Sequence, residues 1–302
     1  MIIPSYLKKG DLIGITCPAS YLDASKVKAC VKTLHQWGFE VMLGKTVGSN
    51  SSNYFSADDE SRLEELQAMM DSPEIKAILF GRGGYGMSRI IDRIDFSRFK
   101  KNPKWLIGFS DLTVMHSHLH QRIKVSSIHG PMAGAFMPSK GMKTKIASLH
   151  DCIIGKPIQY SCKSHKNNRL GEAKGILAGG NLAILTHLIG TKSDINTKGK
   201  ILFIEDVGEH IYQIDRMMIQ LKRSGKLDGL SGLIVGGFTE IKDTERPFGK
   251  SVMEVIKDAV AEYKYPVSYG FPVSHGAENL SLKIGIEYQL EVSKNATTLV
   301  EI

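Results

Sequence analysis

Several features that would place a chain in a special class are missing from this sequence. No segment of its 302 residues approaches the ~18–20 unbroken apolar residues that a membrane-spanning helix needs. There is no internal repeat and no low-complexity tract. Only four cysteines occur, and none forms a C-x-x-C pair: Cys17, Cys30, Cys152 and Cys162. These absences argue against a membrane protein, a repeat protein and a disulfide framework.

The start of the chain and its charge bear on location and partners. Residues 1–11 place apolar residues before the lysines and include Pro4, which is the reverse of a secretory signal, so we expect a cytoplasmic protein with free thiols. The net charge of +8 suits an anionic ligand. Basic residues are nevertheless spread along the chain and no nucleic-acid-binding motif is present, so neither nucleic acid nor membrane is an expected partner.

Short apolar runs alternate with amphipathic segments in the first half. Leu12–Thr16 resembles a buried strand, and the helix that follows places Val27, Cys30, Val31 and Leu34 on one face. The same rhythm predicts strands at 39–43, 75–80, 105–109 and 125–128, and helices near 59–70, 87–94 and 112–122. Alternation of this kind is typical of the α/β class, with a parallel sheet covered on both faces.

The pattern lapses between about 155 and 171, where Lys, Ser, Asn and His dominate. We therefore expect an N-terminal domain over 1–160, a linker over 161–170 and a C-terminal domain over 171–302. The second half predicts a helix beginning at Asn181, further helices at 212–222 and 252–263, and strands at 201–204, 233–235, 281–284, 288–292 and 297–302.

A serine stands where a predicted strand gives way to a helix. Ser110 lies in Gly-Phe-Ser-Asp, and a sharp turn at such a junction can lift a nucleophile above the sheet. The backbone amide of Asp111 would then point to where an oxyanion forms. The motif lacks the second glycine of G-x-S-x-G, and a serine that only caps a helix is the plain alternative.

A glycine-rich turn, Gly81–Gly86, follows another predicted strand. It matches the dinucleotide pattern G-x-G-x-x-G, but backbone N–H groups in such a turn serve an oxyanion hole as well as a phosphate. A nucleotide-binding protein therefore remains the second hypothesis, and a merely flexible turn the plain alternative.

The partners of a nucleophilic serine are a base and an acid that orients it. Glu205 and Asp206 end one predicted strand, and His275 lies in a loop of glycine and proline. The third hypothesis is a metallohydrolase, because His116, His118 and His120 lie close together. The segment lacks the H-E-x-x-H glutamate, and polar positions on a helix explain the histidines better.

Six ordered segments together resemble the LD-carboxypeptidase family over essentially the whole chain. They are GRGGYG, NPKWLIGFSDLT, HGPM, GGNLAILTHLIGT, ILFIEDVGE with YQIDRMMIQL, and GFPVSHGAENLSLKIG. The resemblance implies a flavodoxin-like, amidotransferase-related N-terminal domain, a smaller C-terminal α/β domain and an active site between them, in a homodimer. It also implies a serine peptidase that needs no metal and no cofactor.

The resemblance implies a role for particular residues. Ser110 matches the family's nucleophile, Glu205 its acid and His275 its base, with oxyanion donors near Gly83–Gly84 and at Asp111. Arg82 is a candidate for holding the substrate carboxylate.

Two departures from the family's pattern, Ser274 for a frequent glycine and Lys283 for a frequent proline, are expected at most to reshape the substrate mouth. The usual family reaction releases terminal D-alanine from cytoplasmic murein tetrapeptide during wall recycling. A related branch hydrolyses a peptide-nucleotide antibiotic, and the compact chain favours murein.

Overall fold

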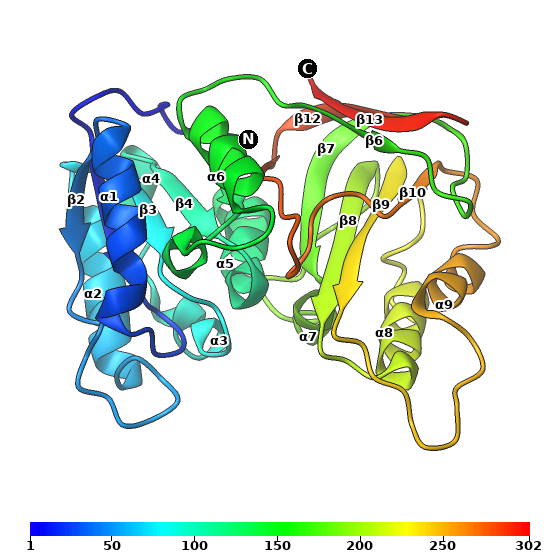
Figure 1. The fold of residues 1–302 in the computed structure, drawn as a ribbon, viewed down its shortest axis with the longest axis horizontal. Helices are drawn as coiled ribbons and strands as arrows, with labels where there is room; N and C mark the ends of the chain where they lie inside the picture. Colours follow the sequence, from blue (N-terminus) through cyan, green and yellow to red (C-terminus); the bar gives the residue numbers. More distant parts are fainter.

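The computed structural model describes all 302 residues and contains two β-sheets side by side (Figure 1). The first sheet has the strand order β11-β5-β4-β3-β1-β2. The five strands that come first in the sequence, β1 to β5, are parallel and lie in the order β2-β1-β3-β4-β5, which is the order of flavodoxin-like sheets. They are β1 (Leu12–Thr16), β2 (Glu40–Leu43), β3 (Ile75–Phe80), β4 (Trp105–Gly108) and β5 (Ser127–His129). The expected α/β class and flavodoxin-like arrangement are confirmed.

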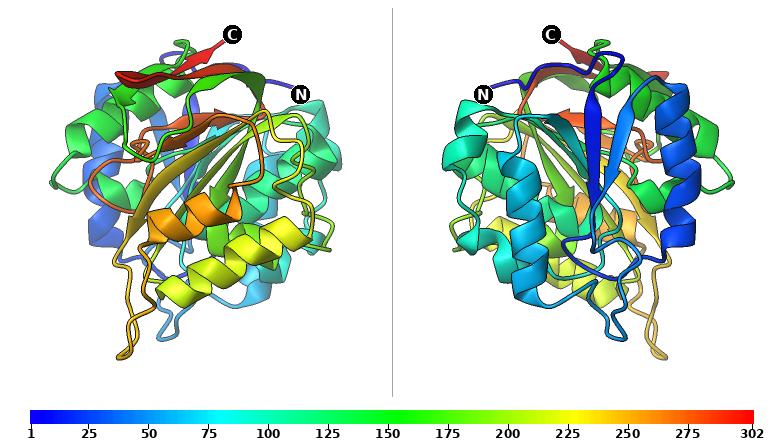
Figure 2. Two further views of the ribbon diagram at one scale, coloured as in Figure 1. Left: turned by 90° about the vertical axis from the view of Figure 1, so that its right-hand side faces the viewer. Right: turned by 90° about the vertical axis from the view of Figure 1, so that its left-hand side faces the viewer.

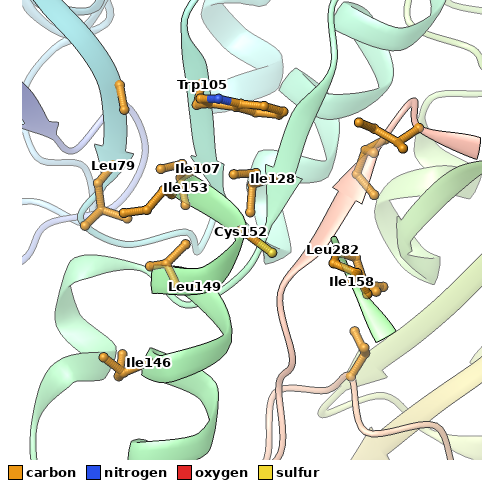
Figure 3. Packing of buried hydrophobic residues seen from close by; sticks show 14 of the residues in the cluster. Leu79, Trp105, Ile107, Ile128, Ile146, Leu149, Cys152, Ile153, Ile158 and Leu282 are labelled. Atoms are coloured by element: carbon orange, nitrogen blue, oxygen red, sulfur yellow. The ribbon is translucent and has the colours of Figure 1, made fainter. Parts of the chain in front are cut away.

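Helices cover both faces of this sheet because its strands are apolar on both sides. Ile13, Leu79 and Ile107 pack against α1 and α6, whereas Ile78 and Leu106 pack against α2 to α5. The helices are α1 (Lys28–Gln36), α2 (Asp59–Asp71), α3 (Met87–Ile90), α4 (Ser97–Lys101), α5 (Thr113–His118) and α6 (Met142–Ile153). The α6 side of this packing is visible in Figure 3.

The second sheet has seven strands in the order β10-β9-β8-β7-β12-β13-β6. Its parallel part carries α7 to α9 on one face, and the antiparallel part closes the other end (Figure 2). The elements are β6 (Gln159–Lys163), β7 (Gly171–Asn181), α7 (Leu182–His187), β8 (Lys200–Val207), α8 (Ile211–Arg223), β9 (Gly232–Thr239), α9 (Val252–Ala259), β10 (Val267–Tyr269), β11 (Leu282–Ile284), β12 (Glu287–Val292) and β13 (Ala296–Glu301).

The chain crosses between the two sheets more than once. β11 comes from the end of the sequence but pairs antiparallel with β5 of the first sheet, with Leu282 opposite His129. β6 begins at residue 159 and pairs with β13, so part of the expected linker 161–170 is a strand. One apolar cluster includes Ile128 of the first sheet and Phe203 of the second. The expected division at 161–170 thus stays a prediction, and the halves share both strands and core.

Five helices and strands were not predicted from the sequence: α4, α6, β6, β7 and β10. β7 carries four glycines and β6 is half exposed, so neither shows an apolar run of the usual length. All four cysteines are free thiols. None of the helices is long and apolar enough to cross a membrane.

Candidate active site

Ser110 occupies a strained turn at the carboxyl end of β4. Its φ is +64°, a left-handed value that L-residues other than glycine rarely adopt. A 3₁₀ turn, Ser110–Leu112, follows at once and leads into α5. Strain of this kind persists only where the surrounding structure imposes it, and it is typical of strand-turn-helix elbows that present a nucleophile.

The glycine turn lies directly against this elbow. A methyl group on Gly83 would lie 3.0 Å from Cβ of Ser110, 3.2 Å from its Oγ and 3.3 Å from the amide nitrogen of Asp111. Only glycine permits so close an approach of the two backbones. The Gly83 carbonyl accepts hydrogen bonds from the hydroxyl of Ser20 (2.6 Å) and its amide (3.1 Å). The peptide bond between Gly83 and Gly84 is trans, so the N–H of Gly84 points in the direction opposite to the Gly83 carbonyl and therefore away from Ser20.

Gly84 is a glycine for two reasons. Its φ is +88°, and a methyl group there would lie 2.5 Å from Oγ of Ser20 and 2.8 Å from the hydroxyl of Tyr54. Arg82, beside it, is exposed and donates from Nη1 to the carbonyl of Tyr21 at 3.1 Å. The structure thus brings Gly83 to the elbow, whereas it shows the Arg82 guanidinium engaged on the surface.

The buried Asp111 carboxyl holds the end of the glycine turn in place. Its Oδ2 accepts a hydrogen bond from the amide of Met87, the first residue of α3, at 2.8 Å. Burial raises the pKa of Asp111 to about 6, although this hydrogen bond and the positive charge of Arg62 both lower it in part. The side chain therefore joins the glycine turn to the elbow, and only the backbone amide of Asp111 is placed near Ser110.

Glu205 and His275 are in contact with each other on the side of the second sheet. Glu205 projects from β8 and is fully buried, and its Oε2 lies 2.6 Å from Nδ1 of His275. A carboxylate at this position accepts the Nδ1 proton, which leaves Nε2 of the neutral ring as a proton acceptor. That Nε2 has no hydrogen-bond partner, so no bond joins it to Ser110 Oγ. Catalytic hydrogen bonds often tighten only once substrate is bound.

Phe109 links the imidazole to the elbow. Its ring centroid lies 4.7 Å from that of His275, and Phe109 immediately precedes Ser110. The centroid of the same ring lies 5.8 Å from that of His129, which is fully buried. Sequence reasoning assigned no role to Phe109 or His129, although both fall within segments that carry the family resemblance.

The helix after Ser110 docks on the strand beside Glu205. Thr113 Oγ1 accepts the amide proton of Asn181 at 3.1 Å, and a methyl group on Gly180 would lie 2.5 Å from the same oxygen. Asn181 stands opposite Glu205 in the pairing of β7 with β8. This contact fixes the elbow relative to Glu205, and no local sequence pattern predicted it.

Asp206, the second acid of the pair, has a structural task. Its carboxylate accepts hydrogen bonds from the side chain of Asn181 at 2.8 Å and the amides of Ala183 and Val207 at 2.9 and 2.8 Å. Burial raises the pKa of Asp206 to about 6, and these bonds lower it in part. Asp206 thus anchors the start of α7, and Glu205 alone reaches His275.

The three clustered histidines take separate positions. His116 is buried, with Nδ1 2.8 Å from Oγ of Ser127 and Nε2 2.8 Å from the carbonyl of Gly108, and burial lowers its pKa to about 4. His118 contacts Ser193 at 3.0 Å through Nδ1. No three His, Cys, Asp or Glu side chains are placed to share a metal ion. His116 thus supports the strand that ends at the elbow.

The glycine turn is poorly suited to a dinucleotide. The helix it opens, α3, has only four residues, whereas the dinucleotide pattern depends on a longer helix whose N-terminus faces the pyrophosphate. The nucleotide hypothesis has no support from this geometry.

The two departures from the family pattern lie in different surroundings. Lys283 is fully buried and its Nζ lies 3.0 Å from a carboxylate oxygen of Glu301, so it joins β11 to β13 rather than lining the site. Ser274 donates to the carbonyl of Glu278 at 2.7 Å and accepts the amide proton of Gly276 at 3.0 Å. Ser274 therefore braces the turn that carries His275.

Comparison with protein families gives two matches. Residues 13–130 match the LD-carboxypeptidase N-terminal domain, and residues 174–290 match the LD-carboxypeptidase C-terminal domain.

Similar proteins carry related names. A probable murein peptide carboxypeptidase of Bacillus subtilis is 35% identical and covers 98% of this chain and 93% of its own. The crystal structure of muramoyltetrapeptide carboxypeptidase from Oxalobacter formigenes superimposes with a TM-score of 0.85, at 27% identity over 96% of this chain and 98% of the other. The microcin C7 self-immunity protein MccF of Escherichia coli is 25% identical over 99% of this chain and 96% of its own.

Proposed function

The chain belongs to the LD-carboxypeptidase family, and on that basis we propose that it is a serine carboxypeptidase that releases terminal D-alanine from murein tetrapeptide. The contact between Glu205 and His275, which leaves Nε2 free on the ring beside the Ser110 elbow, carries the proposal. The names of the Bacillus and Oxalobacter relatives support the substrate class.

The proposed reaction uses each group in turn. His275 Nε2 accepts the proton of Ser110 Oγ as this oxygen attacks the carbonyl carbon of the scissile peptide bond. The developing oxyanion is stabilised by backbone N–H groups of the glycine turn at Gly83–Gly84 and of Asp111. The imidazolium then donates its proton to the leaving amine of D-alanine, and Glu205 stabilises the ring while it is charged. Water, activated by the same histidine, hydrolyses the acyl-enzyme.

The terminal residue would be recognised by its carboxylate and its configuration. Arg82 lies next to the glycine turn and is the cation we propose for the carboxylate; it would have to leave the carbonyl of Tyr21. A peptide without a terminal carboxylate would leave the Arg82 donor unpaired and would bind much more weakly. Peptides capped at the C-terminus should therefore be poor substrates. Action in the cytoplasm during wall recycling, and as a homodimer, are further parts of this proposal, supported by the family resemblance.

A second candidate function is hydrolysis of a peptide-nucleotide antibiotic. It is favoured by the likeness to MccF over nearly the whole chain. The two candidate functions share the proposed triad and differ in the leaving group of the substrate, which is D-alanine in the first and carries a nucleotide in the second.

The deciding experiment is mass spectrometry of murein tetrapeptide after incubation with the protein. We expect loss of one D-alanine to give the tripeptide, with little or no cleavage of the same peptide ending in L-alanine or in an amide. Ser110→Ala should lower turnover by on the order of 10⁶-fold while the peptide still binds. Equal cleavage of the D- and L-terminated peptides would exclude the LD-carboxypeptidase reaction. Preferential cleavage of a peptidyl nucleotide would favour the second candidate.

A further inference from the structure

His129 is a buried titratable side chain that the proposed reaction does not use. It lies at the carboxyl end of β5, opposite Gly108 in the pairing of β4 with β5, and it is fully buried. Neither of its ring nitrogens makes a hydrogen bond of ordinary length and angle. Unpaired polar atoms in the interior destabilise a fold, and an apolar side chain would fill this space without that penalty. A histidine here therefore needs a reason beyond packing.

The imidazole of His129 packs against both sides of the proposed catalytic machinery. Its centroid lies 5.8 Å from that of Phe109, which immediately precedes Ser110. It also lies 4.9 Å from the centroid of Phe203, two residues before Glu205 on β8. The interplanar angles of 64° and 85° are those of edge-to-face aromatic contacts. One buried ring thus touches the elbow of the nucleophile and the strand of the acid.

A third contact of His129 is polar and reaches the loop of the proposed base. Asn279 lies four residues after His275, is only 3% exposed, and has an Oδ1 with no other hydrogen-bond partner. Burial holds the pKa of His129 well below its usual range, and Asn279 is the only neighbour that raises it. A neutral neighbour raises the pKa of an imidazole when it accepts from a ring N–H, so Oδ1 faces a ring nitrogen.

The two side chains have complementary chemistry. A neutral imidazole carries one N–H donor, and an amide oxygen is an acceptor. The contact between them is looser than an ordinary hydrogen bond, and Nε2 of His275 is unpaired as well. Both incomplete contacts belong to the same loop, residues 275–279. Hydrogen bonds of catalytic groups commonly tighten when substrate binds, so closure of this loop can complete the contact with His129.

We propose that His129 is a positioning residue for the proposed pair of Ser110 and His275. Its neutral ring donates a hydrogen bond to Oδ1 of Asn279, and this bond holds the loop that carries His275 against the elbow. The role rests on the proposed function, because it assumes that His275 activates Ser110. An apolar residue at position 129 would keep the packing but would leave the loop without its anchor.

Two variants remove this bond from opposite sides. His129→Phe keeps an aromatic ring without nitrogens, and Asn279→Leu keeps the approximate size of the side chain without its oxygen. Each should lower kcat on murein tetrapeptide by about 10²-fold and leave KM unchanged. The double variant should be no slower than the slower single variant, because both changes remove the same bond. His129→Gln, which still carries an N–H donor, should recover part of the loss.

His120→Phe is the matched control. His120 is also buried, its Nδ1 has no partner, and burial lowers its pKa to about 4. Its charged neighbours include Lys200, the first residue of β8, and no residue of the proposed triad. This variant should leave kcat unchanged. Equal loss of kcat in His120→Phe and His129→Phe would mean that the loss of any buried histidine has this effect, and would overturn the proposal.

Proton NMR gives a measurement that needs no turnover. The contact of 2.6 Å between Nδ1 of His275 and Glu205 should shift the Nδ1 proton to low field, and the loss of this resonance in Glu205→Gln assigns it. The resonance should move in His129→Phe and in Asn279→Leu but not in His120→Phe. An unchanged resonance in the first two variants would overturn the proposal, whatever their kcat. If the wild type cleaves no murein peptide, the proposed function fails, while the resonance still tests the role of His129.

Discussion

The two halves of the candidate site are built by different means. On the side of the first sheet, position is set by backbone: Ser110 has a left-handed φ, and Gly83 lies almost in contact with it. On the side of the second sheet, position is set by charge and side-chain contact: a buried Glu205 holds His275, which itself comes from a loop. The backbone conformations at Ser110 and Gly83 do not themselves titrate, whereas the acid–base pair depends on which protons are bound. Each half can therefore be disturbed separately.

Among variants that keep the Ser110 hydroxyl, the largest expected effect comes from the charged half. Glu205→Gln keeps the side-chain size but removes the charge that fixes the His275 tautomer and stabilises the imidazolium. We expect turnover to fall by about 10⁴-fold with an unchanged unfolding midpoint. Steady-state kinetics on murein tetrapeptide, with thermal unfolding alongside, measures both.

Asp206→Asn is the matched control for that variant. This neighbouring carboxylate anchors α7 and does not touch His275. Stability should suffer and turnover should change little. If Asp206→Asn abolished turnover while Glu205→Gln did not, the acid would be misassigned.

The next effect concerns Asp111, the carboxyl that holds the backbone half together. Burial raises its pKa from 3.8 to about 6. Between about pH 4 and 6 the folded state therefore binds a proton that the unfolded chain has released, so this group's contribution to stability is present at low pH and is lost as pH rises through 6. The change is about 3 kcal/mol at most.

Urea unfolding between pH 4 and 7.5 measures this contribution as the difference between the wild-type protein and Asp111→Asn. The wild type should lose stability relative to the variant as pH rises. If the free energies of unfolding of the two proteins changed with pH in parallel, burial would not raise the pKa of Asp111.

A smaller effect is expected from Gly84→Ala. The added methyl group would lie 2.5 Å from Oγ of Ser20, so the glycine turn must shift relative to Ser110. A displacement of this size should lower kcat by about 10²-fold.

Gly10→Ala is the control for Gly84→Ala. Gly10 has the same φ of +88° but no atom within 4 Å of the new methyl group, so the variant suffers the strain without the clash. Equal loss of kcat in both variants would mean that backbone strain, not placement of the oxyanion donors, is responsible.

Chelation should have the smallest effect. A serine nucleophile activated by histidine needs no Lewis acid, and both ring nitrogens of His116 already contact Ser127 and Gly108. Activity should survive excess EDTA. Loss of activity that zinc restores would make a histidine-based metal site the better explanation. The roles proposed for Ser110 and for the Glu205–His275 pair would then both be wrong.

What the sequence could predict follows the same division. The strands and helices around the elbow were predictable because each apolar run has the period of its element, and the glycines of the turn are conspicuous in themselves. The meeting of Glu205 with His275 was open to prediction only through family resemblance, since 70 residues separate them. The docking of Thr113 on Asn181 depends on how the two sheets pack, and the structural role of Asp206 depends on the pairing of β7 with β8; no local sequence pattern records either.

The return of β11 to the first sheet has a consequence for synthesis. The parallel sheet that carries Ser110 is complete by residue 129, but the outer edge of β5 stays uncovered until Leu282–Ile284 arrive. His275 emerges just before that closing strand. While the chain leaves the ribosome, the proposed nucleophile is thus present without its proposed base, and the segment that delivers this histidine also covers the open edge. Catalytic competence and protection of that edge from pairing with other chains are gained together, within the last tenth or so of translation.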